Sequence, residues 1–396
     1  MKRSLFLLLC IVLLDAIGIG LIFPILPKLL QNLHLSYVSV YLGVLVSLYA
    51  LMQFLFSPVI GSLSDRFGRR PILLLSLFGT CINYLCLAVS HSLFILILGR
   101  IIAGITSANM SVISAYMIDT VKVQKRAQYF GLISATFGIG FIVGPVLGGI
   151  LGDYWVRLPF LVAFALTAIS FLAVLIGLPE PHQYQNKERL SGSINPLAFL
   201  REKDNFKKML PFLVVFSIFS TAGEAYAVCW ALWGQDTFLW NSVWIGLSLG
   251  IFGLCQTLVQ ILLPNRAIRW LGIRKTVLLG IGCSCFALCI MAFSHKAWII
   301  FMVIPVFSLG SIGVPALQMF ASQQVEDHHQ GKLQGLIASS ISLSAIFAPL
   351  FFSFIYSEFS HQWTGAVWIV VAFIYLLMVP LIFKLTQVKQ TLSDNF

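Results

Sequence analysis

Long apolar runs separated by short polar connections make up most of this chain. Twelve runs approach or exceed the roughly 20 apolar residues that a helix needs to cross the hydrocarbon core of a bilayer. We expect these spans at residues 4–27, 38–60, 71–90, 92–117, 128–150, 158–178, 210–233, 241–264, 275–294, 297–321, 333–356 and 364–385. The pattern predicts an all-α membrane protein with twelve transmembrane helices.

The first run follows Met1, Lys2 and Arg3, which is how a secretory signal peptide begins. This run, however, continues through Ile25 without the small-residue site at which a signal peptide is cleaved. We therefore interpret it as a retained first span.

The composition and the placement of charge agree with this topology. Hydrophobic residues make up 59% of the chain and charged residues 10%, whereas soluble proteins carry about 25% charged residues. An ordinary cytosolic enzyme is therefore excluded. The 25 Lys and Arg outnumber the 14 Asp and Glu, which in a soluble protein would suggest nucleic acid as a partner. Here most of the basic residues lie on one side of the membrane if both termini are cytoplasmic, as the positive-inside rule requires.

The chain also resembles itself. A polar stretch that begins at Pro179 divides the spans into two sets of six, and we expect domains at 1–179 and 210–396 joined by a cytoplasmic loop at 180–209. An offset of 204 residues aligns Gly68 with Gly272, and Pro145 with Pro349. Two duplicated six-helix halves are typical of secondary transporters, whose substrate site lies between the halves near the bilayer midplane.

Several motifs resemble those of one transporter family. The segment from Gly61 to Pro71, which contains Asp65, Arg66, Gly68, Arg69 and Arg70, resembles the loop signature of the major facilitator superfamily. Segments 14–20, 99–104 and 140–149 resemble the proton-coupled drug antiporters of that superfamily. Segments 313–318 and 330–335 resemble the tetracycline/proton antiporters.

The resemblance implies the major facilitator fold and a function in drug resistance. The expected protein is a monomeric secondary transporter of the bacterial inner membrane that exports a small amphipathic drug-like compound in exchange for protons, by alternating access. Its expected partners are the small-molecule substrate, protons and the lipid bilayer. Neither a cofactor nor a metal is expected.

Two sets of residues are expected to act as gates. On the cytoplasmic side, Gly61, Asp65, Arg66, Gly68, Arg69, Arg70 and Arg126 form the first set, in which we expect Asp65 to pair with Arg126 as a charged lock. The alternative is that these are solvated charges of a positive-inside loop. The second set is Gly140, Gly144, Pro145 and Gly148. Its three glycines form a stripe without side chains on which another helix can pack closely, and Pro145 allows a kink. The resemblance implies that this span faces the other half.

Three ionisable residues stand out because they lie well inside expected spans, where a charge at the bilayer centre costs about 2.5–3.5 kcal/mol on insertion scales. We interpret Asp15 and Glu224 as candidate proton carriers and Arg100 as their countercharge. The structural alternatives are that Asp15 only braces a broken first helix and that Arg100 makes a structural pair. Glu224 alternatively faces an aqueous cavity and binds a cation.

The chain departs from the tetracycline antiporters at positions that bear on the substrate. Asn83 and Ser284 stand where the resemblance implies intramembrane Asp residues, so two carboxylates suited to a metal–tetracycline complex are missing. Glu224 is an added acid, and with Trp230 and Trp233 it suits a cationic substrate through charge and cation–π contact. We expect Glu224, Trp230, Trp233, Asn83 and Gln318 to bind the substrate.

Two other functions are alternatives to the export of drugs. One is a dedicated exporter of an endogenous metabolite such as a siderophore, and another is a membrane-embedded receptor or enzyme. The sequence contains no phosphate-binding Gly-Lys-Ser/Thr loop and no HExxH motif. The acidic and His residues at 326–329 are expected to be a polar loop rather than a metal site. The eight Cys lie in apolar runs and are expected to be packing thiols.

Overall fold

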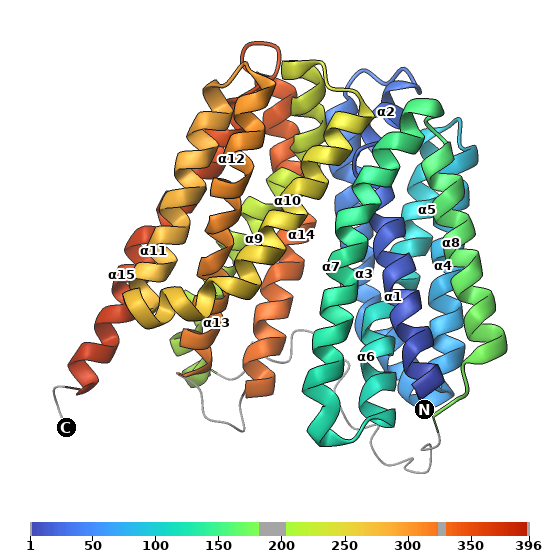
Figure 1. The fold of residues 1–396 in the computed structure, drawn as a ribbon, viewed down its shortest axis with the longest axis horizontal. Helices are drawn as coiled ribbons and strands as arrows, with labels where there is room; N and C mark the ends of the chain where they lie inside the picture. The colour runs from blue at the N-terminus through green and yellow to red at the C-terminus, as the bar shows by residue number, and fades with distance from the viewer. Residues whose placement is uncertain (1, 182–202, 324–329, 394–396) are drawn as a thin grey trace. The chain divides into compact units, whose positions relative to one another are not determined.

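The computed structural model describes residues 2–181, 203–323 and 330–393, and this part of the chain contains helices and no strand (Figure 1). The helices of the N-terminal half are α1 (Lys2–Ile22), α2 (Leu26–Gln31), α3 (Val38–Phe67), α4 (Arg69–Val89), α5 (Leu93–Thr106), α6 (Asn109–Thr120), α7 (Val123–Tyr154) and α8 (Leu158–Gly177). Those of the C-terminal half are α9 (Lys203–Phe238), α10 (Ser242–Leu262), α11 (Pro264–Phe293), α12 (Ala297–Leu309), a 3-10 turn (Gly310–Ile312), α13 (Gly313–Ser322), α14 (Gln330–Phe359) and α15 (Ala366–Ser393).

The expected twelve spans are confirmed. Among the described residues, twelve helical stretches are long and apolar enough to cross a membrane. The expected first span at 4–27 was too long, because α1 ends at Ile22 and the short α2 begins at Leu26. Pro24 and Pro27 explain this ending, since proline lacks the N–H that a helix interior needs and disfavours helical geometry in the residue before it.

The central loop expected at 180–209 is shorter than predicted at its second end. Most of that range lies outside the described residues, but α9 already begins at Lys203. The apolar part of this helix begins at Met209. The expectation placed the helix start where the apolar run starts, whereas a helix can extend into its polar flank.

The chain divides into two compact units, which are described separately. The first comprises Met1–Pro196 with Asn241–Gly250, and the second comprises Leu197–Trp240 with Ile251–Phe396, so α10 is divided between them. In the first unit α1 packs against α7 and α8, and α4 packs against α5 and α8 (Figure 1). In the second unit α9 packs against α14 and α15, and α11 packs against α12, α13 and α15.

The two units repeat each other in backbone geometry. Gly68 and Gly272, which the offset of 204 residues aligns, both have a positive φ, of 106° and 75°. The fourth span is interrupted at Ser107 and Ala108, and the tenth is interrupted by the 3-10 turn at Gly310–Ile312, again at aligned positions. The duplication seen in the sequence is thus also a duplication of where the helices break.

Glycines let α7 approach α1 more closely than side chains would allow. A Cβ placed on Gly140 would lie 2.8 Å from the carbonyl oxygen of Leu13, and one on Gly144 would lie 2.7 Å from that of Ile17. A Cβ on Gly148 would lie 2.6 Å from the carbonyl oxygen of Leu21. The stripe therefore packs against α1 of the same half. Another side of α7 meets α10, because a Cβ on Gly149 would contact the carbonyl oxygen of Ser242 and one on Gly246 would contact that of Pro145. The expectation that this span faces the other half stays a prediction.

The equivalent contact in the second unit uses a hydroxyl in place of a glycine. The Ser344 hydroxyl of α14 donates a hydrogen bond of 3.0 Å to the carbonyl oxygen of Ser217 in α9. The offset of 204 aligns these two residues with Gly140 and Leu13. One carbonyl on the first helix of each half is therefore approached by the fifth helix, by close packing in one unit and by a hydrogen bond in the other.

We predict that Gly144→Ala lowers the melting temperature of the purified protein in detergent, because the added methyl group has only α1 backbone to displace. Overpacking of this kind costs about 1–3 kcal/mol. The matched control is Gly131→Ala in the same helix, where a Cβ would meet no atom within 4 Å. Gly131→Ala should leave the melting temperature unchanged or raise it, since alanine favours a helix over glycine by roughly 0.5–1 kcal/mol. Equal melting temperatures for the two variants would contradict the packing argument.

Candidate functional site

A buried polar contact in the first unit joins α1 to α6. Asp15 on α1 and Asn109, the first residue of α6, are each 8% exposed. The Asn109 side-chain amide donates a hydrogen bond of 3.1 Å to the Asp15 carboxylate. The side-chain oxygen of Asn109 has no hydrogen-bond partner in the described structure. The buried acid found in the sequence thus lies at the point where the fourth span is interrupted.

Two side chains of α3 contact Ser107, at the break between α5 and α6. The Tyr49 and Ser107 hydroxyl oxygens lie 2.6 Å apart, and the Gln53 amide donates to the Ser107 hydroxyl at 3.0 Å. Irregular backbone at membrane depth is tolerated only where it is buried in protein or lines a polar cavity. These two α3 side chains provide polar surroundings for the break between α5 and α6.

Arg100 on α5 lies near the same group of residues without an ion-pair partner. It is 8% exposed, and its Nε has no hydrogen-bond partner in the described structure. The preceding residue, Gly99, packs on α4, where a Cβ on it would lie 3.6 Å from the Cα of Asn83. None of the ion pairs of the described residues involves Arg100, and its role as a countercharge stays a prediction.

Tyr84 and Asn83 extend the polar group onto α4. A Cβ placed on Gly18 would lie 2.8 Å from the Tyr84 hydroxyl, so this hydroxyl lies against α1 one turn beyond Asp15. The neighbouring Asn83 is 4% exposed, and its side-chain oxygen has no hydrogen-bond partner among the described residues. The structure therefore brings Asp15, Asn83 and Arg100 into one polar interior region of the first unit.

Glu224 and Gln318 belong to the second unit. Glu224 lies on α9 and is partly exposed, and it has no hydrogen-bond or ion-pair partner in the part of the chain that the structure describes. Gln318 on α13 is exposed. The sequence analysis grouped both residues with Asn83 as substrate contacts, but no described contact joins Glu224 to Gln318.

Trp230 and Trp233 are buried in an aromatic cluster. They are 1% and 0% exposed, and their ring centroids lie 5.9 and 5.2 Å from that of Trp368 on α15. Tyr226 packs on Trp230 from the preceding turn of α9, with 4.4 Å between ring centroids. A cation–π role for the two tryptophans requires this cluster to open.

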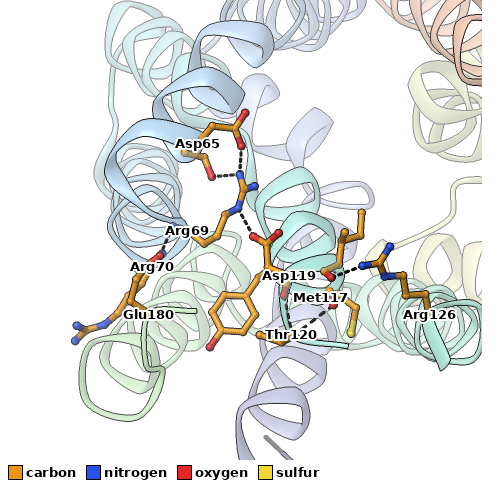
Figure 2. Close-up of polar contacts among 11 residues, drawn as sticks. Asp65, Arg69, Arg70, Met117, Asp119, Thr120, Arg126 and Glu180 are labelled. Carbon is orange, nitrogen blue, oxygen red and sulfur yellow. Dashed lines mark hydrogen bonds and ion pairs between the residues drawn. The ribbon is translucent and has the colours of Figure 1, made fainter. Parts of the chain in front are cut away.

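A charged cluster joins the α3–α4 connection to α6 (Figure 2). The Arg69 guanidinium lies 2.6 Å from the Asp65 carboxylate and donates a 2.9 Å hydrogen bond to Asp119. The expected lock between Asp65 and Arg126 is not formed. The Arg126 guanidinium instead donates to the carbonyl oxygens of Ile118 and Val121, at 2.9 and 3.3 Å. It satisfies carbonyls at the end of α6 that have no partner within the helix.

Glu180, which was not among the residues expected from the sequence, completes this region. Its carboxylate accepts hydrogen bonds from the backbone N–H groups of Arg69 and Arg70, at 2.6 and 3.0 Å. These N–H groups open α4, where a negative charge also interacts favourably with the helix dipole. The Arg70 guanidinium donates in return to the carbonyl oxygen of Leu175 near the end of α8, at 2.6 Å. The position of Glu180 directly after an apolar span is a weak signal, because the sequence does not say that α8 lies beside α4.

Gly68 is required here for two separate reasons. Its φ of 106° is a conformation that residues with a side chain rarely adopt. A Cβ at this position would also lie 2.8 Å from the Glu180 carboxylate. Among the remaining gate residues, Gly61 has open space around it and Arg66 lies over the Phe67 ring at 5.3 Å.

Potential metal ligands do not gather in the described structure. No group of three or more His, Cys, Asp and Glu side chains is close enough to hold a metal ion within those residues. The acidic and His residues at 326–329 lie outside them. All eight Cys are free thiols.

We predict that Glu180→Ala lowers the melting temperature, because two N–H groups at the start of α4 lose their acceptor. Removal of a helix cap typically costs about 0.5–2 kcal/mol. The matched control is Glu358→Ala, since Glu358 is exposed on α14. The capping role would be refuted if both variants unfolded at the temperature of the unmodified protein.

The chain matches the family model of the Major Facilitator Superfamily over residues 8–264 and 214–395. Among solved structures, it is similar to the nucleoside transporter NupG, with a TM-score of 0.76 and 14% identity over 96% of this chain and 99% of the other. It is also similar to the human organic anion transporter MFSD10, with a TM-score of 0.68 and 21% identity over 96% and 99% of the two chains. These structures show that the fold is shared.

Similar sequences narrow the assignment. The chain is 40% identical to the class C tetracycline resistance protein of Escherichia coli over 380 residues, which is 96% of each protein. It is 37% identical to the class B tetracycline resistance protein of Escherichia coli over 394 residues, which is 98% of each. The chain therefore belongs to the Major Facilitator Superfamily and, within it, to the family of the tetracycline resistance proteins.

Proposed function

We propose that this protein is a secondary transporter that exports a small amphipathic drug-like compound in exchange for protons, by alternating access. The observation that carries the proposal is the Asp15–Asn109 contact, a buried carboxylate at a break in a membrane-spanning helix. Membership in a family of tetracycline resistance proteins supports drug export over siderophore export, and over a receptor or an enzyme. The proposed setting is the bacterial inner membrane, with both termini cytoplasmic and the protein acting as a monomer.

Hydrogen bonding connects the protonation of Asp15 to the broken helix. An ionised carboxylate only accepts hydrogen bonds, so it takes one from the Asn109 amide and leaves the Asn109 side-chain oxygen unpaired. A protonated carboxyl group also donates, and it can satisfy that oxygen while still accepting from the amide. Protonation therefore changes the contact between α1 and α6, which is what a coupling site must do.

Glu224 supplies a second acid with a different environment. It is partly exposed and has no described protein partner, so its carboxylate is available to a proton or to a cationic group of the substrate. Trp230, Trp233, Asn83 and Gln318 remain proposed substrate contacts. The two tryptophans would take part only in a conformation in which the aromatic cluster opens.

Arg69 is the centre of the proposed cytoplasmic gate. It contacts carboxylates on two different elements, Asp65 at the end of α3 and Asp119 on α6. Alternating access requires some contacts at the cytoplasmic ends of the helices to form and break in each cycle. A cation shared by two partly exposed acids is suited to this, because such pairs contribute little net stability each.

We predict that Asp15→Asn and Glu224→Gln each reduce proton-coupled transport by at least tenfold, about 1.4 kcal/mol, in liposomes carrying a pH gradient. The lumenal pH would be followed while tetracycline, cationic dyes, fluoroquinolones and chelators are added one at a time. Substrate-triggered proton movement in the unmodified protein supports antiport. Glu358→Gln, which removes an exposed acid, should transport normally.

Two results would count against this proposal. Normal transport by both variants would remove Asp15 and Glu224 from the proton pathway. Substrate movement without proton movement in the unmodified protein would make it a uniporter or a carrier coupled to another ion.

We also predict that Arg69→Gln impairs transport more than Arg126→Gln does. Arg69→Gln leaves two carboxylates without their cation, whereas Arg126→Gln removes hydrogen bonds to two carbonyls of one helix end. Initial transport rates of the two variants, normalised to protein incorporated in the liposomes, test this. A larger defect in Arg126→Gln would favour the lock with Arg126 that the sequence suggested.

A further inference from the structure

The Arg100 guanidinium is buried in the first unit without a counterion. Its side chain is 8% exposed, its Nε has no hydrogen-bond partner, and none of the ion pairs of the described residues involves it. Arginine stays protonated in proteins, so this site cannot avoid its charge by losing a proton. A buried charge is normally paired, because removal from water is costly unless an opposite charge or hydrogen bonds replace the water.

The acids of the unit that the structure describes all have other partners. Asp15 is bonded to Asn109, and Asp65 and Asp119 contact Arg69. The two remaining acids are Glu180 and Asp153. The Glu180 carboxylate accepts hydrogen bonds from N–H groups at the start of α4, and the Asp153 carboxylate lies 3.6 Å from the Lys28 ammonium group. None of these acids forms an ion pair with Arg100 in this structure, so the guanidinium is available to an anionic group of a ligand.

The groups around Arg100 indicate which kind of anionic group fits beside it. Tyr49 lies at the break that follows α5, where its hydroxyl oxygen is 2.6 Å from that of Ser107, and Tyr84 follows Asn83 on α4 with its hydroxyl against Gly18. The preceding residue, Gly99, packs on α4, where a Cβ on it would lie 3.6 Å from the Cα of Asn83. The buried Asn83 side-chain oxygen has no partner either, and it requires a donor. A ligand that carries an ionised oxygen with an O–H or N–H group near it would satisfy both orphan groups.

We propose that Arg100, together with Asn83, Tyr49 and Tyr84, forms a binding subsite for a carboxylate or enolate oxygen of the transported compound. This inference rests on the proposed function and names its substrate class, which is a compound with an ionised oxygen that binds without a metal ion. The guanidinium suits such a group because it binds planar, delocalised oxygen anions through two parallel hydrogen bonds. Arg100 then acts as a specificity residue that contacts the substrate.

The test compares an acid with its ester in competition for the same protein. Tritiated tetracycline with EDTA would be bound to purified protein in detergent, and then displaced by norfloxacin or by norfloxacin ethyl ester, which lacks the carboxylate. We expect the acid to displace tetracycline at a concentration at least about tenfold lower than the ester, since a hydrogen bond to a charged group is worth that much or more. The preference should vanish in Arg100→Gln and persist in part in Arg100→Lys.

The acid-to-ester ratio separates a binding role from a structural one. A variant that is merely destabilised binds both competitors less well and keeps the ratio. Arg266→Gln, the same substitution at an exposed arginine of α11, should keep both the ratio and the affinity. Should Arg100→Gln fail to remain monodisperse, the ratios of the unmodified protein and of Arg100→Lys decide the question.

Three results would overturn the subsite. The first is an ester that competes as well as the acid in the unmodified protein, and the second is an unchanged ratio in Arg100→Gln. The third result applies if neither compound displaces tetracycline. In that case the affinity for tetracycline itself is compared, and equal affinities of Arg100→Gln and Arg266→Gln would overturn the subsite. An unmodified protein that binds none of the compounds would instead overturn the proposed function and the subsite together, which distinguishes the two failures.

Discussion

The pairing of backbone N–H and C=O groups in an apolar medium is the constraint on which this structure depends. A bilayer core offers no water to these groups, so each span has to be helical, and each break in a span has to bring its own partners. The break at Ser107 and Ala108 is surrounded by Tyr49, Gln53 and Asn109. The proposed proton carrier Asp15 is therefore bonded to a residue of the break itself, and polar side chains surround the irregular backbone at this depth.

The same constraint explains why helix ends and charged residues coincide. Glu180 accepts from the first N–H groups of α4, and Arg126 donates to the last carbonyls of α6. A charge used in this way fixes one helix end relative to another. Arg69 also connects helix ends, because it contacts Asp65 at the end of α3 and Asp119 near the end of α6. Charged residues of this short region thus connect the ends of four helices of the first unit.

Much of the fold follows from the sequence, because run length and repetition are properties of the chain itself. The twelve spans required only counting, and the offset that aligns Gly68 with Gly272 also aligned the helix breaks and the carbonyl contacts of Leu13 and Ser217. The partner of each charged side chain could not be predicted from the sequence. Asp65 contacts Arg69, four residues away in the chain, rather than Arg126, since the direction of a side chain at a helix end depends on the neighbouring helix.

The residues of the candidate site could be predicted from the sequence, but their surroundings could not. A charge inside an apolar run is visible in a sequence, so Asp15, Arg100 and Glu224 were found without the structure. Their environments were not, because burial and pairing arise from helices far apart in the chain. Trp230 and Trp233 illustrate this, since their spacing suits a ligand cage and a packed interior equally, and only Trp368 and Tyr226 reveal the packing.

The carboxylate of Glu180 has a consequence for the chain that follows α8. Helix α8 ends at Gly177, but the Tyr116 hydroxyl donates a 2.6 Å hydrogen bond to the Pro179 carbonyl oxygen, and the N–H groups at the start of α4 bind Glu180. The chain is thus held at Glu180, beyond the end of the helix. A displacement of the first turn of α4 is therefore passed to the residues that follow α8, although the two helices are not neighbours in the sequence.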